Sequence, residues 1–300
     1  MISAAETHRI DSPPEHTVPT DGLATAQLAC TVIEPRHGWR LIDFREIWRY
    51  RELLFFLAWR DVKVRYKQTV LGAAWAVLQP LATMLVFSLF FGRMASQARS
   101  DLPYPLFVLA GLVPWMFFAN AIGSAGQSIV GNQNLVTKVY FPRLIIPGAV
   151  VCAGLVDLAV SFATLQAMMV FYGVAPGWEV LLVPPLTFLL TVAALGVGTL
   201  LSALTVAYRD FRYIIPFLVQ IWMFATPSIY LQAGDGVGTW WHGLLPLNPA
   251  YGLILNFRRA LTGGGVDVYS LTVSGAVAVA LLAVGCLYFR RVERSFADVI

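Results

Sequence analysis

Long uncharged stretches, separated by short charged segments, fill most of the chain after residue 67. Six of these stretches have about the length that a membrane-spanning helix requires, roughly 20 residues. They occupy residues 68–92, 102–137, 144–178, 180–208, 213–234 and 268–289, and only Asp157 interrupts one of them. The pattern predicts an all-α membrane protein whose six transmembrane helices lie between residues 68 and 290.

A seventh uncharged stretch, residues 236–257, differs from the other six in composition. It contains four glycines, two prolines and the polar residues His242, Asn248 and Asn256. Proline and glycine interrupt a helix, and lipid offers no partner for the backbone groups that are freed. We therefore expect a re-entrant element here, between spans five and six, rather than a seventh span.

The distribution of basic residues supports six spans. With a cytoplasmic N-terminus, only Arg93, Arg99, Arg258 and Arg259 of the 21 Lys and Arg residues fall outside. A seventh span would also place the arginines of residues 290–294 outside, against the known excess of Lys and Arg in cytoplasmic loops. Both termini are therefore expected in the cytoplasm.

The segments that flank the membrane domain have different compositions. Residues 1–35 lack the continuous apolar run of a signal peptide, and we expect a disordered cytoplasmic tail there, with a second tail at residues 291–300. Residues 36–67 mix aromatic and basic side chains. At about 100° per residue, one face carries Phe44, Trp48, Phe55, Trp59, Val62 and Tyr66, and most cations lie on another. This pattern predicts an amphipathic helix in the cytoplasmic membrane interface.

Composition excludes several classes of protein. Hydrophobic residues make up 58% of the chain and charged residues 13%, whereas a soluble domain is about 25% charged. The chain is therefore a poor candidate for a soluble enzyme, a coiled coil or a disordered protein. The net charge of +4 fits basic cytoplasmic loops better than nucleic-acid binding. Three cysteines without a Cys/His cluster predict neither a disulfide nor a metal site.

The chain lacks the motifs of nucleotide binding and catalysis. It has no GxxxxGK[ST] motif, HExxH, GxSxG or paired carboxylates, so we expect no cofactor in this chain. Asp157 is the one acid deep within a span, with Ser161 one turn away and no Lys or Arg in another span to pair with it. An acid within a span is a functional candidate, but a lone one favours structural hydrogen bonding over proton coupling.

One long run and several short motifs resemble a known family. Residues Arg60–Pro80, RDVKVRYKQTVLGAAWAVLQP, resemble the N-terminal signature of ABC-2-type permeases that export polysaccharides. Four shorter motifs agree with this signature: YFPR at residues 140–143, ATPSIY at 225–230, NPAYGLILNFR at 248–258 and the terminal FADVI. The resemblance covers nearly everything from residue 40 onward. The chain is similar to the membrane subunit of an O-antigen or related lipid-linked polysaccharide exporter.

This resemblance implies an assembly and a location. Such permeases have an interfacial helix, six membrane helices and short re-entrant helices between spans five and six. They act as homodimers with two copies of a separate ATPase subunit, which binds ATP and Mg²⁺. The chain would then be a permease and not an enzyme, located in the bacterial inner membrane. Its cargo would be an undecaprenyl-pyrophosphate-linked polysaccharide, and nucleic acid would not be a partner.

The polar loop 131–143 is the longest on the cytoplasmic side and a candidate for ATPase coupling. We expect a coupling helix that docks on the ATPase, although an ordinary solvated connection would have the same composition. The candidate residues are Asn132, Asn134, Lys138, Tyr140 and Arg143.

A basic cluster before the first span could meet the pyrophosphate of the lipid carrier, because Arg and Lys favour phosphate near a membrane surface. Its members are Arg60, Lys63, Arg65 and Lys67. The alternative is a simple membrane anchor.

Aromatic side chains offer flat surfaces to the apolar faces of sugar rings, so aromatic residues within the spans are candidates for lining a channel. They are Trp75, Trp115, Phe118, Phe217, Trp222 and Tyr230. Packing and contact with lipid explain such residues equally well.

Other functions remain open at this stage. The same architecture could export teichoic acid, capsule polysaccharide, a drug or a lipid. A membrane-bound glycan or acyl transferase would need convergent His or carboxylate side chains, and a secondary transporter more than one acid within its spans. Neither pattern occurs in the sequence.

Overall fold

Helices make up nearly all of the described part of the computed structural model, which comprises residues 44–67, 72–95, 102–175, 177–226 and 243–293. These residues belong to one unit, Trp39–Ile300, and contain no strand. The all-α prediction is thus confirmed for them. The expected tail at residues 1–35, the end of the C-terminal tail and Tyr230 lie outside the described residues.

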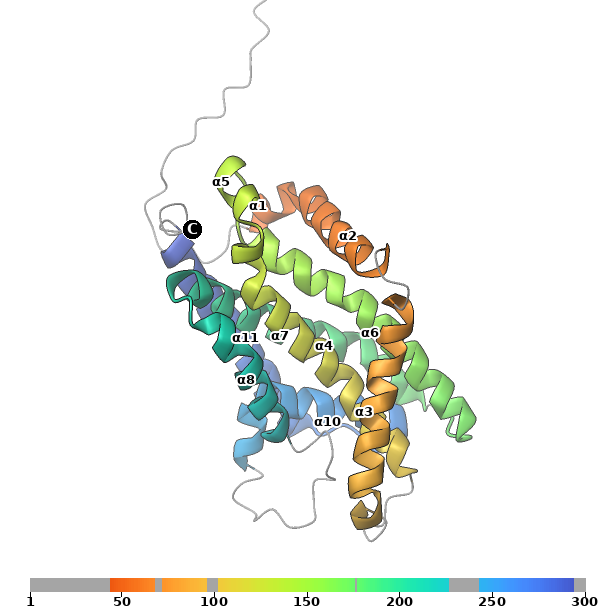
Figure 1. The fold of residues 1–300 in the computed structure, drawn as a ribbon. Coiled ribbons are helices and arrows are strands. Elements are labelled where there is room, and N and C mark those ends of the chain that lie inside the picture. Colours follow the sequence, from red (N-terminus) through yellow and green to blue (C-terminus); the bar gives the residue numbers. More distant parts are fainter. Residues whose placement is uncertain (1–43, 68–71, 96–101, 176, 227–242, 294–300) are drawn as a thin grey trace, which may run out of the picture. The chain divides into compact units, whose positions relative to one another are not determined.

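Figure 1 shows the arrangement of the helices. The N-terminal helices are α1 (Phe44–Arg49) and α2 (Arg51–Lys67). The remaining elements are α3 (Gly72–Ala95), α4 (Tyr104–Gly131), α5 (Gln133–Lys138), α6 (Ile145–Phe171), the 3-10 turn η1 (Trp178–Leu182), α7 (Val183–Ala207), α8 (Phe211–Phe224), the 3-10 turn η3 (Leu245–Leu247), α10 (Pro249–Thr262) and α11 (Val268–Glu293).

Within the described residues, five helical segments are long and apolar enough to cross a membrane. They are Ala74–Gly92, Tyr104–Gly131, Ile145–Phe171, Trp178–Ala207 and Val268–Glu293. They match the first four predicted spans and the sixth.

The fifth predicted span, residues 213–234, is only partly matched. Its helix α8 has 14 residues and ends at Phe224, which gives about 21 Å against the roughly 30 Å of a hydrocarbon core. The carbonyl of Ala225, just beyond the helix, accepts a hydrogen bond from the Asn248 side chain at 3.2 Å. This contact helps explain why the helix stops there, and residues 227–242 lie outside the description.

α4 lies at the centre of the core. In the most apolar stretch of α4, 78% of the residues are buried, whereas only 11% are buried in the corresponding stretch of α3. α7 and α11 pack closely, because Gly196 and Gly285 bring the backbone of one helix against the other. α3 and α8 both pack on α4 but leave large apolar side chains such as Phe90 and Phe217 exposed.

The described part of the predicted re-entrant stretch, residues 243–257, contains η3 and most of α10. α10 is too short to span a bilayer, at 14 residues, and nearly all of its side chains are buried. It continues through Arg258 to Thr262 and ends at Gly263, which has a φ of +70°. The sequence boundary at Phe257 rested on the charge of Arg258, but this side chain is 4% exposed. Its guanidinium lies 3.9 Å from the centre of the Phe107 ring, so it does not end the helix.

Candidate functional site

The short helix α5 joins α4 to α6 at one end of the bundle (Figure 1). Val136 and Phe141 bury one side of this segment in a cluster with Leu57, Ile129 and Ile145. Asn134 and Lys138 are exposed, and Tyr140 is 69% exposed. We name these three residues, Asn134, Lys138 and Tyr140, the α5 surface. The structure brings them together at the surface as a partner-binding site would require.

The other two coupling candidates point into the molecule instead. Asn132 accepts a hydrogen bond from Arg60 at 3.0 Å and donates one to the Ser128 carbonyl at 2.8 Å. The Arg143 backbone N–H donates to the Glu293 carboxylate, and its guanidinium donates to the Glu293 carbonyl at 2.7 Å. Both residues therefore fix the ends of the α5 segment to its neighbours rather than presenting a surface.

α2 has two distinct faces. Leu57 is buried, and Leu53, Leu54 and Ala58 pack around the same cluster as α5. The opposite side exposes Phe55 and Trp59, whose rings are stacked with centroids 6.4 Å apart. Exposed aromatic side chains beside basic residues are typical of a helix at a membrane interface.

The four basic candidates on α2 separate into two pairs. Lys63 and Lys67 are exposed, and the Lys63 ammonium lies 5.7 Å from the centre of the Trp59 ring. Arg60 is held by Asp61 at 2.8 Å as well as by Asn132, and Arg65 is ion-paired with Asp157. Of these four candidates, the two lysines are therefore the most available to an anionic headgroup.

Asp157 has partners that sequence reasoning missed. One carboxylate oxygen is ion-paired with Arg65, and the other accepts a 2.5 Å hydrogen bond from the Tyr66 hydroxyl. Burial and this hydrogen bond raise the pKa of Tyr66 to about 12, so the phenol stays protonated and acts as the donor. The sequence offered Asp157 no Lys or Arg within another span, and Arg65 lies outside the spans, at the end of α2. The adjacent Arg65 and Tyr66, just before the first span, were the feature of the sequence from which these partners could have been inferred.

The structure places the aromatic candidates in three different environments. Trp115 and Phe118 are 3% and 0% exposed and lie in the core. Neither side chain therefore offers a surface to a sugar ring. Trp222 is half-buried and donates to the Asn248 side chain at 2.8 Å. Trp75 and Phe217 are exposed on α3 and α8. They remain the described candidates for a transport surface.

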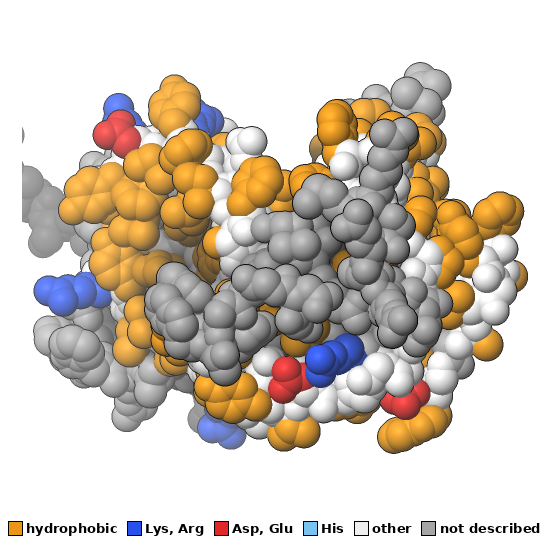
Figure 2. Space-filling view, turned by 90° about the horizontal axis from the view of Figure 1, so that it is seen from below, with side chains coloured by type: hydrophobic (Ala, Val, Ile, Leu, Met, Phe, Trp, Pro, Cys, Tyr) orange, Lys and Arg blue, Asp and Glu red, His pale blue; other side chains and the backbone are white. Residues whose placement is uncertain are grey.

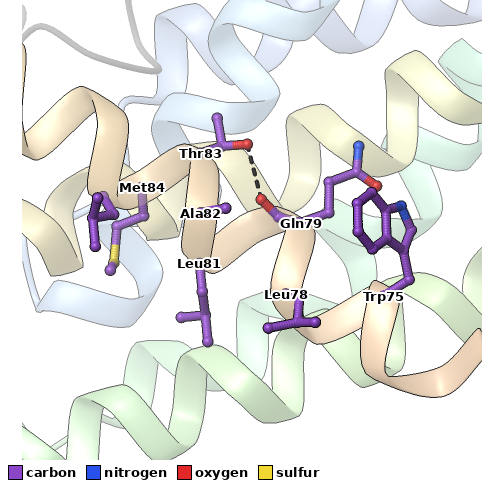
Figure 3. Close-up of a pocket in the computed structure, with 8 residues that line it drawn as sticks. Trp75, Leu78, Gln79, Leu81, Ala82, Thr83 and Met84 are labelled. Carbon is purple, nitrogen blue, oxygen red and sulfur yellow. Dashed lines mark hydrogen bonds between the residues drawn. The ribbon is translucent and has the colours of Figure 1, made fainter. Parts of the chain in front are cut away.

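A hollow of about 450 Å³ lies along α3 around Pro80, and its lining residues all belong to α3. Figure 3 shows the side chains of Trp75 and Gln79 next to each other in this hollow. Because a single helix lines it, the hollow is an open surface and not an enclosed binding site. Figure 2, which views the end opposite α5, shows mostly hydrophobic side chains and few charged ones among the coloured residues.

The family model for ABC-2 type transporters matches residues 52–260. The chain belongs to the ABC-2 transporter family. With its apolar helices, it is thus a multi-pass membrane protein and a transporter subunit.

Individual relatives of this ABC-2 transporter are similar over almost their whole length. The O-antigen export system permease protein RfbA of Myxococcus xanthus is 31% identical over 258 residues, which cover 85% of this chain and 98% of the relative. An RfbA protein of Klebsiella pneumoniae is 25% identical, with 83% and 95% covered. The polysialic acid transport protein KpsM of Escherichia coli is 24% identical, with 79% and 92% covered.

Proposed function

We propose that the chain is the membrane subunit of an ABC transporter that exports a lipid-linked, O-antigen-like polysaccharide across the bacterial inner membrane. The observation behind this proposal is the 31% identity to an O-antigen export permease over 98% of that protein. Similarity over a whole membrane domain favours a shared class of cargo. A separate ATPase subunit would bind ATP and Mg²⁺, while this chain holds no cofactor.

The working assembly in this proposal contains two copies of the chain and two ATPase subunits. Each copy crosses the membrane six times, with α8 and the residues after it as the fifth span, α10 as a re-entrant helix and both termini in the cytoplasm. The exposed apolar faces of α3 and α8 support a second copy beside them. Between two copies, Trp75 and Phe217 could provide flat surfaces for sugar rings.

Capsule polysaccharide is the second candidate cargo. The similarity to KpsM, a polysialic acid transport protein, favours it over a drug or a small lipid. Its lower identity of 24%, against 31% for RfbA, places it behind O-antigen.

Deletion of the gene in its native host tests both proposals. We expect surface polysaccharide to be lost and to return when the chain and its ATPase subunit are expressed together. Release of the remaining glycan by mild acid would identify a pyrophosphate-linked carrier. Unchanged surface glycan in the deletion strain would overturn the proposed export function, and loss of capsule alone would favour the second candidate.

Changes in the α5 surface should weaken the complex with the ATPase. In the double variant Lys138→Glu, Tyr140→Ala, an exposed aromatic contact is lost and a charge is reversed where the partner would dock. Truncating a hot-spot residue of an interface costs about 2 kcal/mol or more, so we expect the affinity to fall about tenfold to thirtyfold if the α5 surface is central to the contact. Titration of the purified permease with the ATPase subunit measures this.

Trp178→Ala provides the control for this double variant. Trp178 is also exposed, but it belongs to η1, which follows the other end of α6. Its loss should leave the affinity unchanged. An equal effect of both variants would show that the α5 surface has no special role.

Removal of both exposed lysines of α2 should impair recruitment of the lipid carrier. A Lys near an anionic surface contributes about 1 kcal/mol, so Lys63→Gln with Lys67→Gln should reduce export by about tenfold to thirtyfold at limiting carrier. The pair Arg209→Gln with Arg212→Gln removes the same charge from another exposed segment and should have a smaller effect. Surface glycan and membrane topology are measured together. If the double lysine variant is correctly oriented and still exports normally, α2 acts only as a membrane anchor.

A further inference from the structure

Two polar contacts attach α2 to different parts of the bundle. The Arg60 guanidinium reaches Asn132 at 3.0 Å, the residue that lies between α4 and α5. Five residues later, Arg65 and Tyr66 both bind the Asp157 carboxylate of α6. Leu57, three residues before Arg60, is buried in a cluster with residues of α4, α5 and α6. A displacement of α5 therefore cannot leave α2 unaffected.

Asp157 uses both of its oxygens in this arrangement. The residue lies near the middle of α6, 12 residues after Ile145, and its side chain is about 29% exposed. Arg and Tyr both remain protonated donors at physiological pH. The carboxylate thus lies between two permanent donors, which suits a mechanical link better than a proton carrier.

Ser161, one turn after Asp157, holds the beginning of α3. Proline has no N–H, so Pro80 leaves the carbonyl of Ala76 without its usual helical donor. The Ser161 hydroxyl donates to this carbonyl at 3.4 Å. One face of α6 therefore binds the last residues of α2 and the first turns of α3, on either side of the connection at residues 68–71.

α3 has little buried surface, so the contacts near its start bear directly on where its first turns lie. Only 11% of its apolar window is buried, the smallest share among the five described candidate spans. Its interior proline also weakens the helix at the level of Ser161. α3 also packs on α4, and its first turns are in addition held by the Ser161–Ala76 contact and by the attachment of the end of α2 to α6.

We propose that Asp157 is a positioning residue for transport. By holding Arg65 and Tyr66, and with Ser161 beside it, Asp157 keeps the end of α2 and the start of α3 attached to α6. Movement imposed on α5 by the ATPase is then transmitted through α2 to α3, the helix with the exposed transport surface. The inference rests on the proposed export function, because it assigns to Asp157 the coupling of ATP hydrolysis to that export.

The test compares Asp157→Asn with the wild-type complex of permease and ATPase. The amide keeps the size of the side chain but removes the ion pair with Arg65. Surface polysaccharide should fall about tenfold, within the range produced by mutations that alter coupling, while the amount of complex and its ATPase rate stay unchanged. The exchange Arg65→Asp with Asp157→Arg should restore part of the export, because it restores the ion pair.

Glu52→Gln is the matched control, since it removes an exposed carboxylate from α2 without touching α6, and it should export normally. Full export by Asp157→Asn, or a parallel loss of complex, ATPase rate and export, would overturn the inference.

If Asp157→Asn does not accumulate, Tyr66→Phe tests the same inference, because it removes one hydrogen bond to Asp157 and keeps every charge. Full export by Tyr66→Phe would also overturn the inference. Failure of the wild-type complex to export would instead refute the proposed function.

Discussion

Gly285→Ala is expected to destabilise the protein by about 1 to 3 kcal/mol, the usual cost of overpacking, and Gly285→Leu to prevent its accumulation. A Cβ atom at Gly285 would lie 2.4 Å from the carbonyl oxygen of Gly196 and 2.7 Å from the Thr199 hydroxyl. A backbone atom cannot rotate away, so α7 and α11 would have to separate. Close approach at small residues is what holds helices together in lipid, and the loss should therefore affect the whole bundle.

The melting temperature of the detergent-solubilised protein measures this effect, with Gly275→Ala as the control on the same helix. A Cβ atom there would meet only the Leu189 side chain, at 4.0 Å. Alanine favours a helix by up to about 1 kcal/mol over glycine, so this variant should be neutral or slightly more stable. Equal melting temperatures for Gly285→Ala and Gly275→Ala would contradict the close packing of α7 and α11.

Asn248→Leu is expected to cost about 3 kcal/mol or more, because each buried polar group left unpaired costs about 1 to 3 kcal/mol. The Asn248 carboxamide oxygen accepts from the Trp222 indole at 2.8 Å and from the Ala250 N–H at 3.1 Å. Its amide nitrogen donates to the Thr226 hydroxyl at 2.9 Å and to the Ala225 carbonyl. The side chain thus joins the end of α8 to the start of α10.

Two further variants define the cause of this loss in a thermal unfolding assay. Asn248→Asp keeps the acceptor for Trp222 and Ala250 but loses both donated bonds, so its melting temperature should lie between those of Asn248→Leu and the wild type. Asn134→Ala removes an exposed amide and should change little. A melting temperature for Asn248→Leu equal to that of the wild type would show that these four hydrogen bonds do not hold α8 to α10.

The charge pattern predicts most of the fold because lipid excludes charge, so the gaps between charged residues mark the apolar helices. The rule fails where a charge is buried in protein rather than placed in water. Arg258 is such a case: its guanidinium lies 3.9 Å from the centre of the Phe107 ring, and α10 continues past this charge to Thr262. The early end of α8 has a different cause, because no charge lies there: the end of the helix is next to a contact from Asn248, an uncharged residue 24 positions after Phe224 in the sequence.

The candidate site could be predicted only in part. The polar composition of loop 131–143 identified the α5 surface, because a segment that is polar in this chain lies outside the lipid. Composition could not show that Asn132 and Arg143 turn inward, since hydrogen bonds to Arg60 and Glu293 depend on the tertiary fold. The burial of Trp115 and Phe118 was equally hidden, because lipid and the protein interior both accept aromatic side chains.

The burial of α10 also sets an order of events during synthesis. α10 packs on α4 and α7, which leave the ribosome before it, and on α11, which leaves after it. The Ser274 hydroxyl of α11 donates to the Pro246 carbonyl just before α10, and Gly252 lies against the Ser270 backbone. Until α11 is inserted, α10 has polar groups and a small-residue face without these partners, and it is too short to be held as a span. α11, which is translated after α10, therefore completes the packing around α10, and a nascent chain arrested before Val268 would leave α10 without these partners.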